Sequence, residues 1–477
     1  MRAPAVRTAL QSQRQHATTP PPAVPVDVAV MFAIPVLTLV DMLMPMRWTL
    51  WCIALVTAVF IVRQAGFVAL PVRRTSAFLA VVTAVLLPLL PDPGAALERG
   101  VRIGALIASL LVTINLLSRA AARLPRVRVL LESLYRVSPS RRYGALSLAS
   151  QFFGGFLGLA GIAMMMESAA GQKHFGYREK LSSFSAVTRG YAALSLWSPM
   201  YSNMSIVLAM YEGAHWADVL PVALVVTSLF IVIGIALDKL VGVPRNAQAE
   251  ASSVSAKGLV REGWPVLLGM LGFLSFMVLT SRGLGLPISA VIIAGAPVAA
   301  WLLNAHLYGD GSSTYGTAAR QVLLDMTSFR GMAGEVMMFM ASGCAGTVIG
   351  SAIPAAWTAT IGAAVAGSPA LACLTVSGAI VLMSVSALHP MLSAVIVGAS
   401  LGPAQLGLPV LAHLSAVLVG WSLAIIVTPF SVVSALASRW SGIPVLVISL
   451  RANATFVLLA LGTSACMLGL LARWMPH

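Results

Sequence analysis

Residues 386–393 read Ser386-Ala-Leu-His389-Pro390-Met391-Leu-Ser393, in the middle of the apolar run VSGAIVLMSVSALHPMLSAVIVGASLG (376–402). The run is long enough to cross a bilayer, for which about 20 apolar residues suffice. A proline inside such a helix removes a backbone hydrogen bond and bends the chain. In hydrocarbon the freed carbonyl groups need partners, so a broken helix persists only inside protein or beside a water-filled cavity. The stretch therefore predicts a helix break in the interior of a membrane protein.

The whole composition agrees with this class of protein. Hydrophobic residues make up 58% of the 477 residues, charged residues only 9%, and the mean hydropathy is +0.91, whereas a soluble domain carries roughly 25% charged residues. We predict an all-α polytopic membrane protein with about 10–13 membrane segments. It is expected to be a multi-pass protein of the inner (cytoplasmic) membrane, surrounded by lipids.

The net charge of +15 does not indicate nucleic-acid binding. The basic residues lie mostly between apolar segments, as the positive-inside rule predicts. Residues 1–27 are polar and proline-rich, and we expect a disordered tail with the N-terminus in the cytoplasm.

Neither an enzyme nor a metal site is indicated. The four cysteines are scattered in apolar runs without metal-ligand spacing, which is typical of small core residues. The sequence contains no P-loop, HExxH or GxSxG motif. We therefore predict a protein that is not an enzyme and has no cofactor and no metal.

An internal repeat is suggested by a second proline-containing stretch. Residues 195–202 read SLWSPMYS and align with SALHPMLS at 386–393, with four of eight positions identical and an offset of 191 residues. The only long polar linker, 238–263, separates the two stretches. We predict a first membrane repeat at 28–237 and a second at 264–477.

Two broken helices at matching places are typical of the central site of a secondary transporter. Half-helix ends offer N–H groups to anions and carbonyl groups to cations, and serine hydroxyls add further ligands. The candidate residues for binding solute or ion are Ser195, Ser198, Pro199, Ser202, Asn203, Ser205, Ser386, His389, Pro390 and Ser393.

In this layout the chain resembles the ion transporter superfamily, which includes divalent anion/sodium symporters, arsenite carriers and citrate carriers. The resemblance implies two inverted repeats, each with a re-entrant hairpin and a helix broken at a Ser-Asn-Thr-like tip. The Gly-rich blocks 149–170 and 335–353 would be the hairpins. Ser202-Asn203-Met-Ser is the nearest match to the tip motif, whereas the second tip has no Asn. That departure weakens the expectation of sodium coordination.

Three ionisable residues could couple transport to an ion, and each has a structural alternative. His389 could titrate near neutral pH or hydrogen-bond a carbonyl freed by Pro390. Glu335 could be a coupling carboxylate or the partner of Arg330. Arg189 could balance an anion or extend to the membrane interface. Ser202 and Asn203 could also cap a half helix.

The sequence therefore predicts a secondary active transporter (permease, symport) of a small, anionic solute such as a carboxylate, working by alternating access. Protons are favoured over sodium as the coupling ion because His389 replaces the Asn of the second tip. The alternative is an intramembrane enzyme or lipid-handling protein, and a homodimer is left open.

Overall fold

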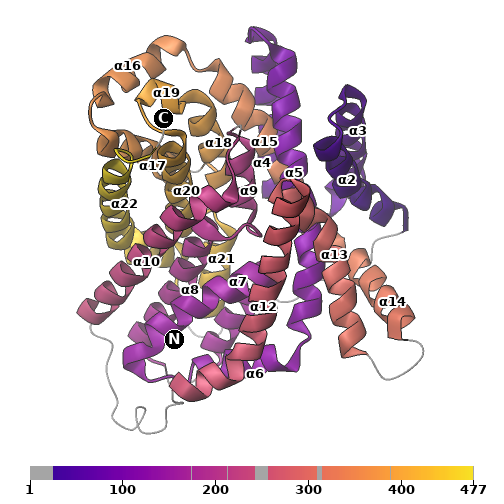
Figure 1. The fold of residues 1–477 in the computed structure, drawn as a ribbon, viewed down its shortest axis with the longest axis vertical. Coiled ribbons are helices and arrows are strands. Elements are labelled where there is room, and N and C mark those ends of the chain that lie inside the picture. Colours follow the sequence, from indigo (N-terminus) through magenta and orange to yellow (C-terminus); the bar gives the residue numbers. More distant parts are fainter. Residues whose placement is uncertain are drawn as a thin grey trace, which may run out of the picture.

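The computed structural model describes residues 25–172, 175–211, 213–241, 256–308, 314–386 and 388–475. Within these ranges the regular structure is helical, and 11 helices are long and apolar enough to cross a membrane. The predicted all-α polytopic membrane protein is thus confirmed. Figure 1 shows α5 near the middle of the molecule, with α2, α3, α13 and α14 on one side and α10, α17 and α22 on the other.

The first half of the chain contributes helices α2 to α10. Their bounds are α2 Pro25–Leu43, α3 Arg47–Gln64, α4 Leu70–Leu86, α5 Pro93–Ala122, α6 Pro125–Leu134, α7 Pro139–Ala170, α8 Tyr177–Trp197, α9 Ser202–Ala209 and α10 Trp216–Val241.

The second half contributes helices α12 to α22. Their bounds are α12 Ala256–Leu284, α13 Ile288–Leu307, α14 Thr314–Thr327, α15 Ala333–Ala352, α16 Ala355–Val365, α17 Pro369–Val385, α18 Pro390–Ser400, α19 Pro403–Leu406, α20 Val410–Val427, α21 Val432–Ser441 and α22 Ala452–Leu471. Short 3-10 turns span Ala65–Phe67, Leu87–Leu89 and Ser328–Met332, and a π turn spans Val447–Arg451.

Two predicted segments fall partly outside the described residues. Of the predicted tail at 1–27, only the last residues are described, and they already belong to α2. The predicted linker at 238–263 is helical at both ends, because α10 continues to Val241 and α12 begins at Ala256. The residues between those two positions lie outside the described ranges.

Helix α7 folds back on itself at Gly158, which has a φ of 52°. A Cβ atom built on Gly161 would lie 2.6 Å from the Phe153 carbonyl oxygen, whereas eight residues of continuous helix span about 12 Å. Likewise, the Tyr135 hydroxyl, which precedes α7, donates to the Met165 carbonyl at 2.5 Å. A glycine tolerates the positive φ that this reversal needs. The block 149–170 therefore forms a hairpin, as the family resemblance implies.

The next element is a helix broken at Pro199. α8 ends at Trp197, and the Ser198 N–H still bonds the Leu194 carbonyl at 3.0 Å. Ser198 then turns to an extended conformation with ψ 122°. Pro199 has no N–H to continue the helix, and α9 begins three residues later at Ser202. This break was predicted from the sequence.

The stretch 386–393 has a different structure from the stretch 195–202. Helices α17 and α18 pack against each other, and the Ser384 hydroxyl donates to the Ser393 hydroxyl at 3.2 Å. Nine residues of continuous helix would span about 13.5 Å, so the chain reverses here and forms a second hairpin. The predicted equivalence of the two stretches is therefore wrong: one is a hairpin tip and the other is a break within a helix.

The structural counterpart of the first break lies at Thr428–Ser431. α20 ends at Val427, Thr428 is extended with ψ 134°, and α21 begins after Ser431. Pro429 occupies the same place in this break as Pro199 in the first. The Thr428 hydroxyl donates to the Ser384 carbonyl at 2.9 Å, so this break is tied to the second hairpin.

The order of a hairpin, a broken helix and a long helix thus occurs twice. A shift of 230 residues aligns several residues of the two copies. Ser-Pro begins both hairpins at 138–139 and 368–369, and Ser-Ala-Val precedes a glycine at 185–190 and 415–420. The Ser422 hydroxyl donates to the Ala192 carbonyl at 2.6 Å, and these two residues are 230 positions apart. Contacts between equivalent residues are expected at a two-fold axis.

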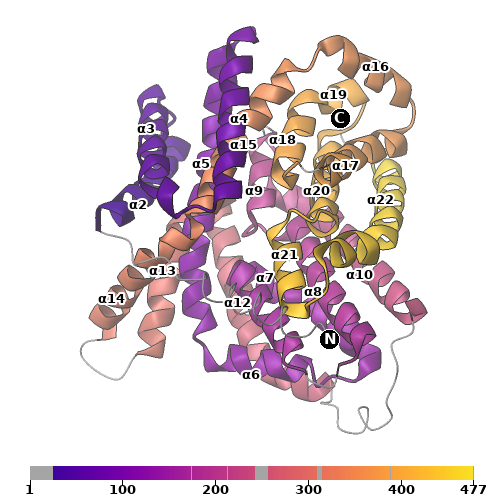
Figure 2. The same ribbon diagram turned by 180° about the vertical axis from the view of Figure 1, so that it is seen from behind.

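Each broken helix crosses its own hairpin at an equivalent glycine. A Cβ atom on Gly190 would lie 2.2 Å from the Ser147 carbonyl oxygen, and one on Gly420 would lie 2.8 Å from the Ser377 carbonyl oxygen. Both pairs keep the shift of 230 residues. Figure 2 shows the α7 hairpin in the lower half and α17–α18 in the upper half, so the two hairpins enter from opposite ends.

The block 335–353 was predicted to be a hairpin but belongs to the continuous helix α15. Its glycines serve a close helix crossing instead. A Cβ atom on Gly343 would lie 2.9 Å from the Gly104 nitrogen and 3.0 Å from the Gly100 carbonyl oxygen of α5. Close backbone approach is the usual reason for small residues between membrane helices.

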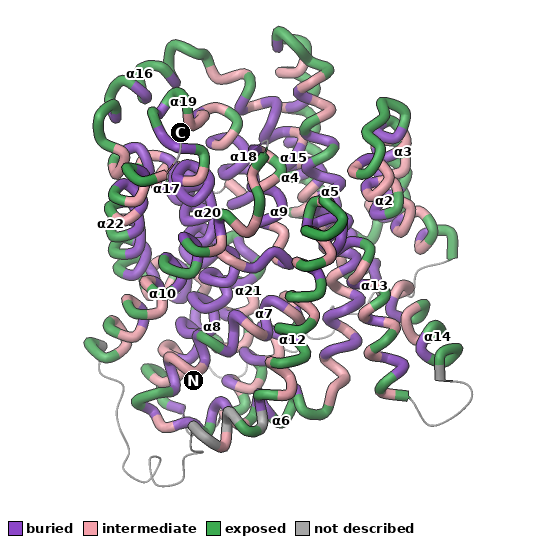
Figure 3. Tube along the Cα trace, in the orientation of Figure 1, coloured by how far each residue is buried: buried purple, intermediate pink, exposed green. Residues whose placement is uncertain are grey.

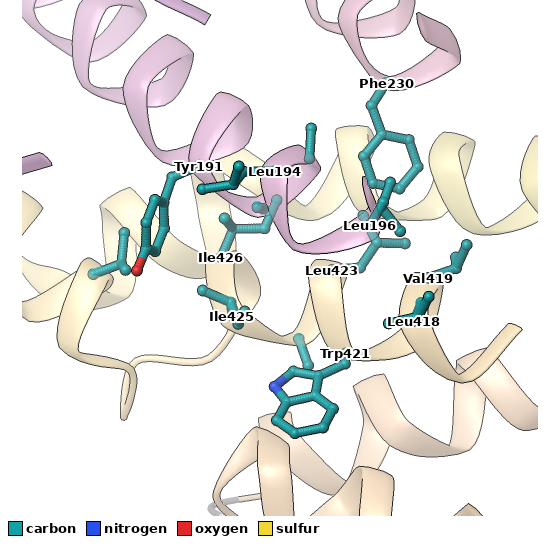
Figure 4. Close-up of a cluster of buried hydrophobic side chains, with 14 of the residues drawn as sticks. Tyr191, Leu194, Leu196, Phe230, Leu418, Val419, Trp421, Leu423, Ile425 and Ile426 are labelled. Atoms are coloured by element: carbon teal, nitrogen blue, oxygen red, sulfur yellow. The ribbon is translucent and has the colours of Figure 1, made fainter. Parts of the chain in front are cut away.

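The buried core surrounds the crossing of α8 and α20. Figure 3 shows most of these two helices as buried, whereas α3 and α12 carry many exposed residues. In Figure 4, Tyr191 and Leu194 of α8 lie beside Ile425 and Ile426 of α20, and Phe230 of α10 lies above Leu196. The two broken helices therefore form the protected centre of the molecule.

Candidate functional site

A cavity of about 740 Å³ lies where both hairpin tips and both helix breaks meet. Its wall includes Gly158 from the first hairpin, Tyr201 to Asn203 from the first break, His389 and Pro390 from the second hairpin, and Phe430 to Val433 from the second break. The N-terminal part of α15, the middle of α5, the start of α4 and residues of α8 and α20 also contribute to it. A volume of this size suits a small organic solute.

Ser202 and Asn203 are the two residues of the first predicted tip that line the cavity. They form the first turn of α9, which has no side-chain cap among the described residues. Asn203 is only 4% exposed, and its Nδ2 atom has no hydrogen-bond partner in the described ranges. A buried donor without a partner costs about 1–3 kcal/mol.

The other predicted residues of the first tip do not line this cavity. Ser195 is fully buried, and its hydroxyl donates to the Ala192 carbonyl at 2.7 Å. Ser198 and Pro199 form the break itself, and the Ser205 hydroxyl donates to the Pro199 carbonyl at 3.3 Å. Ser205 borders a second cavity of about 670 Å³ between the α9–α10 and α12–α13 connections. The hydroxyls of Ser195 and Ser205 thus bond backbone carbonyls of α8 and of the break.

His389 lines the cavity and caps α18. Its Nδ1 atom accepts a hydrogen bond from the Met391 N–H at 3.3 Å, which requires that nitrogen to be unprotonated. The ring lies edge-on to Phe339 of α15, with 5.7 Å between ring centroids. The sequence offered a structural alternative in which the His389 ring bonds a carbonyl freed by Pro390. In the structure the ring nitrogen instead accepts a bond from the Met391 N–H.

Neither predicted serine of the second tip faces the cavity. Ser386 is exposed, and its hydroxyl donates to the Leu382 carbonyl at 2.9 Å. Ser393 is buried and donates to the His389 carbonyl at 3.3 Å. Both hydroxyls support the hairpin backbone.

Glu335 lies on the cavity wall in the first turn of α15. No hydrogen bond or ion pair joins its carboxyl group to another residue of the described ranges. The side chain of Arg330, its predicted partner, lies outside the described residues. Glu335 is also the only charged residue among the described residues of the wall, which includes no lysine or arginine.

Arg189 does not border the cavity. It is 7% exposed, and its guanidinium donates to the Asn453 side chain and the Ala452 carbonyl, both at 2.8 Å. It also lies 4.6 Å from the ring centroid of Phe456. The side chain therefore ties α8 to α22 and does not extend to a membrane interface, and this placement does not favour contact with a solute in the cavity.

Several cavity residues were missed by the sequence reasoning. They are Asn115 and Ser118 of α5, Gly158 at the hairpin tip, Tyr191 and Trp421 of the crossing helices, and Phe430 and Ser431 of the second break. The Thr428-Pro429 pair inside an apolar segment was a usable signal for the second break.

Several helix N-termini contribute to the cavity wall. The first turns of α9, α15, α18 and α21 all contribute residues to it. Helix N-termini carry a partial positive charge, which favours anions. In α18 and α21 an N–H group of the first turn is bonded to the His389 Nδ1 atom and the Ser431 hydroxyl, respectively. Within the described ranges no group of three or more His, Cys, Asp or Glu residues could hold a metal ion.

Comparisons with known proteins are informative on the fold. No family model matches the sequence, and no curated protein matches it. The YdaH transporter of Alcanivorax borkumensis, described as having an unusual topology, is similar in structure, with a TM-score of 0.52 and 15% identity. The match covers 85% of this chain and 98% of that chain. At this identity the likeness shows a shared fold, that of a membrane transporter.

A second solved structure is more distant. MtrF of Neisseria gonorrhoeae, described as illuminating a class of antimetabolite efflux pumps, has a TM-score of 0.49 and 10% identity. The match covers 77% of this chain and 81% of that chain. Membership of the ion transporter superfamily stays a resemblance.

Proposed function

We propose that this chain is a secondary active transporter that moves a small anionic solute through the cavity between the two helix breaks. The observation that carries the proposal is the meeting of four helix N-termini at one cavity whose wall holds the unpartnered amide of Asn203. The partial positive charge of these helix ends and an amide donor favour a carboxylate without any arginine or lysine among the described wall residues. The shared fold with the YdaH transporter supports the same class of function.

The two hairpins supply a means of alternating access. Each hairpin tip borders the cavity, and each hairpin enters from its own end of the molecule. Movement of the hairpin-containing parts against the rest would open the cavity to one side at a time. The two most basic linkers, at 63–74 and 119–142, follow the second and fourth apolar segments and so lie on the same side as the N-terminus. By the positive-inside rule, we propose an inner-membrane protein with its N-terminus in the cytoplasm.

The test uses purified protein in proteoliposomes and a panel of labelled carboxylates: acetate, lactate, succinate and citrate. Thermal-shift measurements on the detergent-solubilised protein select the carboxylate that stabilises it most, and uptake of that carboxylate is then measured. Asn203→Ala should weaken its apparent affinity about tenfold, the equivalent of one lost hydrogen bond of about 1.4 kcal/mol. Ser202→Ala should reduce uptake.

Ser386→Ala is the matched control for Ser202→Ala. Both serines belong to predicted tips, but only Ser202 borders the cavity. Uptake by the Ser386→Ala variant should equal that of the unmodified protein. The proposal fails if no carboxylate is taken up, or if the Asn203→Ala variant transports with unchanged affinity.

A further inference from the structure

We infer that Glu335 couples the transport of each anion to one proton. The carboxyl group of Glu335 would carry the proton while the anion occupies the same cavity. This inference rests on the proposed function, because it concerns the anion bound in the same cavity. The sequence offered three candidates for coupling transport to an ion, and this inference assigns the role to the carboxyl group of one of them, in α15.

The first step is the placement of the carboxyl group. Glu335 borders the same cavity as Asn203 and His389, and it has no hydrogen-bond or ion-pair partner within the described ranges. Carboxylates at membrane depth usually have a partner or face a water-filled cavity. The cavity itself is therefore the environment that this group can respond to.

The second step is electrostatic. A cavity of about 740 Å³ would be about 11 Å across if spherical, so an anion inside it lies within that distance of the carboxyl group. Two like charges about 8 Å apart, at an effective dielectric constant of about 20, lower the affinity roughly 30-fold. No lysine or arginine among the described wall residues offsets this repulsion.

The third step follows from linkage. Protonation of the Glu335 carboxylate gives a neutral carboxylic acid and removes the repulsion, so the protonated form binds the anion more tightly. By reciprocity, the bound anion favours uptake of a proton by the same factor. One monovalent anion then crosses with one proton, and no net charge moves.

The other titratable groups on the wall are less suited to this role. They are His389 of α18, Tyr191 of α8 and Tyr201 of the first break. The Nδ1 atom of His389 is occupied by the Met391 N–H. Helices α4 and α5, which also pack against α15, contribute only non-titratable residues to the described wall.

The experiment measures carboxylate uptake and internal pH together in proteoliposomes, using the panel member selected above. In the unmodified protein, an inward proton gradient should drive accumulation, and the apparent affinity should rise as the pH falls from about 8 to about 5.5. Glu335→Gln should bind the carboxylate with a nearly pH-independent affinity. It should still exchange external for internal carboxylate, but it should lose accumulation driven by the proton gradient at least tenfold.

Two further variants guard against a merely structural effect. Glu335→Asp keeps the carboxyl group and should keep proton-driven accumulation. Glu167→Gln removes an exposed carboxyl group of α7 that does not border the cavity, and its transport should be unchanged. Exchange by Glu335→Gln shows that this variant is folded.

The outcomes separate the two proposals. If the unmodified protein takes up no carboxylate of the panel, the proposed function fails. If it does, and Glu335→Gln still accumulates the carboxylate in response to the proton gradient, only the inference about Glu335 is overturned. Loss of exchange in Glu335→Gln together with loss of coupling in Glu335→Asp would also overturn it, because the site would then depend on the shape of the side chain.

Discussion

Replacement of Gly190 by alanine should destabilise the protein strongly. Gly190 lies where α8 crosses the first hairpin, and alanine there should cost more than alanine at any other glycine where a broken helix crosses its hairpin. A Cβ atom at this position would lie 2.1 Å from the Ser150 hydroxyl and 2.2 Å from the Ser147 carbonyl oxygen. The hydroxyl can rotate away, but the carbonyl belongs to the hairpin backbone. To restore normal contact, α8 and the hairpin would have to separate by about 1 Å, and contacts across such a gap are largely lost.

The magnitude follows from the size of the overlap. Overpacking of a tightly packed interface costs about 1–3 kcal/mol and sometimes more, and we expect Gly190→Ala to lower the free energy of unfolding by about 3 kcal/mol. The equivalent change Gly420→Ala meets the Ser377 backbone at 2.8 Å. Its smaller overlap should cost about 1–2 kcal/mol.

Gly378→Ala in α17 is the matched control, because a Cβ atom there meets nothing within 4 Å. It should leave the stability unchanged or raise it by up to about 1 kcal/mol through helix propensity. The assay is equilibrium unfolding in mixed detergent micelles, followed by the fluorescence of the ten tryptophans. A Gly190→Ala protein within about 0.5 kcal/mol of the unmodified one, or a Gly378→Ala protein as unstable as Gly190→Ala, would refute the packing argument.

Three further predictions concern single polar contacts. Arg123 donates to Asp325 at 2.8 Å and is partly exposed, so a double-mutant cycle of Arg123→Gln and Asp325→Asn should give a coupling of about 1 kcal/mol. The hydrogen bond that Arg123 donates to Asp325 raises the pKa of Arg123, so this guanidinium should stay charged, and the coupling should not fall between about pH 6 and pH 9. Arg189→Met should lower the free energy of unfolding by about 3 kcal/mol because it leaves buried acceptors without donors, and normal stability would contradict its role as a tie. Tyr135→Phe removes the bond to the Met165 carbonyl and should cost about 1–2 kcal/mol, which thermal unfolding in detergent can detect.

The class of protein and part of the cavity wall were determined by local sequence. Long apolar runs specify membrane helices wherever they occur, because the bilayer leaves the backbone no other way to satisfy its hydrogen bonds. A proline inside such a run ends the ladder of bonds, so the break at Pro199 could be predicted from the residues alone. Ser202, Asn203, His389, Pro390 and Glu335 were predicted as site candidates and do border the cavity.

Whether the chain continues or reverses at a break was decided by tertiary structure. Pro199 and Pro390 have the same local effect, yet one lies within a broken helix and the other follows a hairpin tip. The direction depends on which neighbour bonds the freed backbone groups, as the Thr428 hydroxyl does when it donates to the Ser384 carbonyl. Such partners lie far away in the sequence.

The side of a helix that faces the cavity was likewise not encoded locally. Ser195 and Ser202 both flank Pro199, but Ser195 bonds its own helix while Ser202 starts the next one at the cavity. In a chain of uniformly apolar helices, the hydrophobic pattern does not distinguish a lipid-facing side from a protein-facing one. The repeat with a shift of 230 residues became visible only when the folded chain placed Ser422 against Ala192, because packing geometry is conserved between the two units while most of their side chains differ.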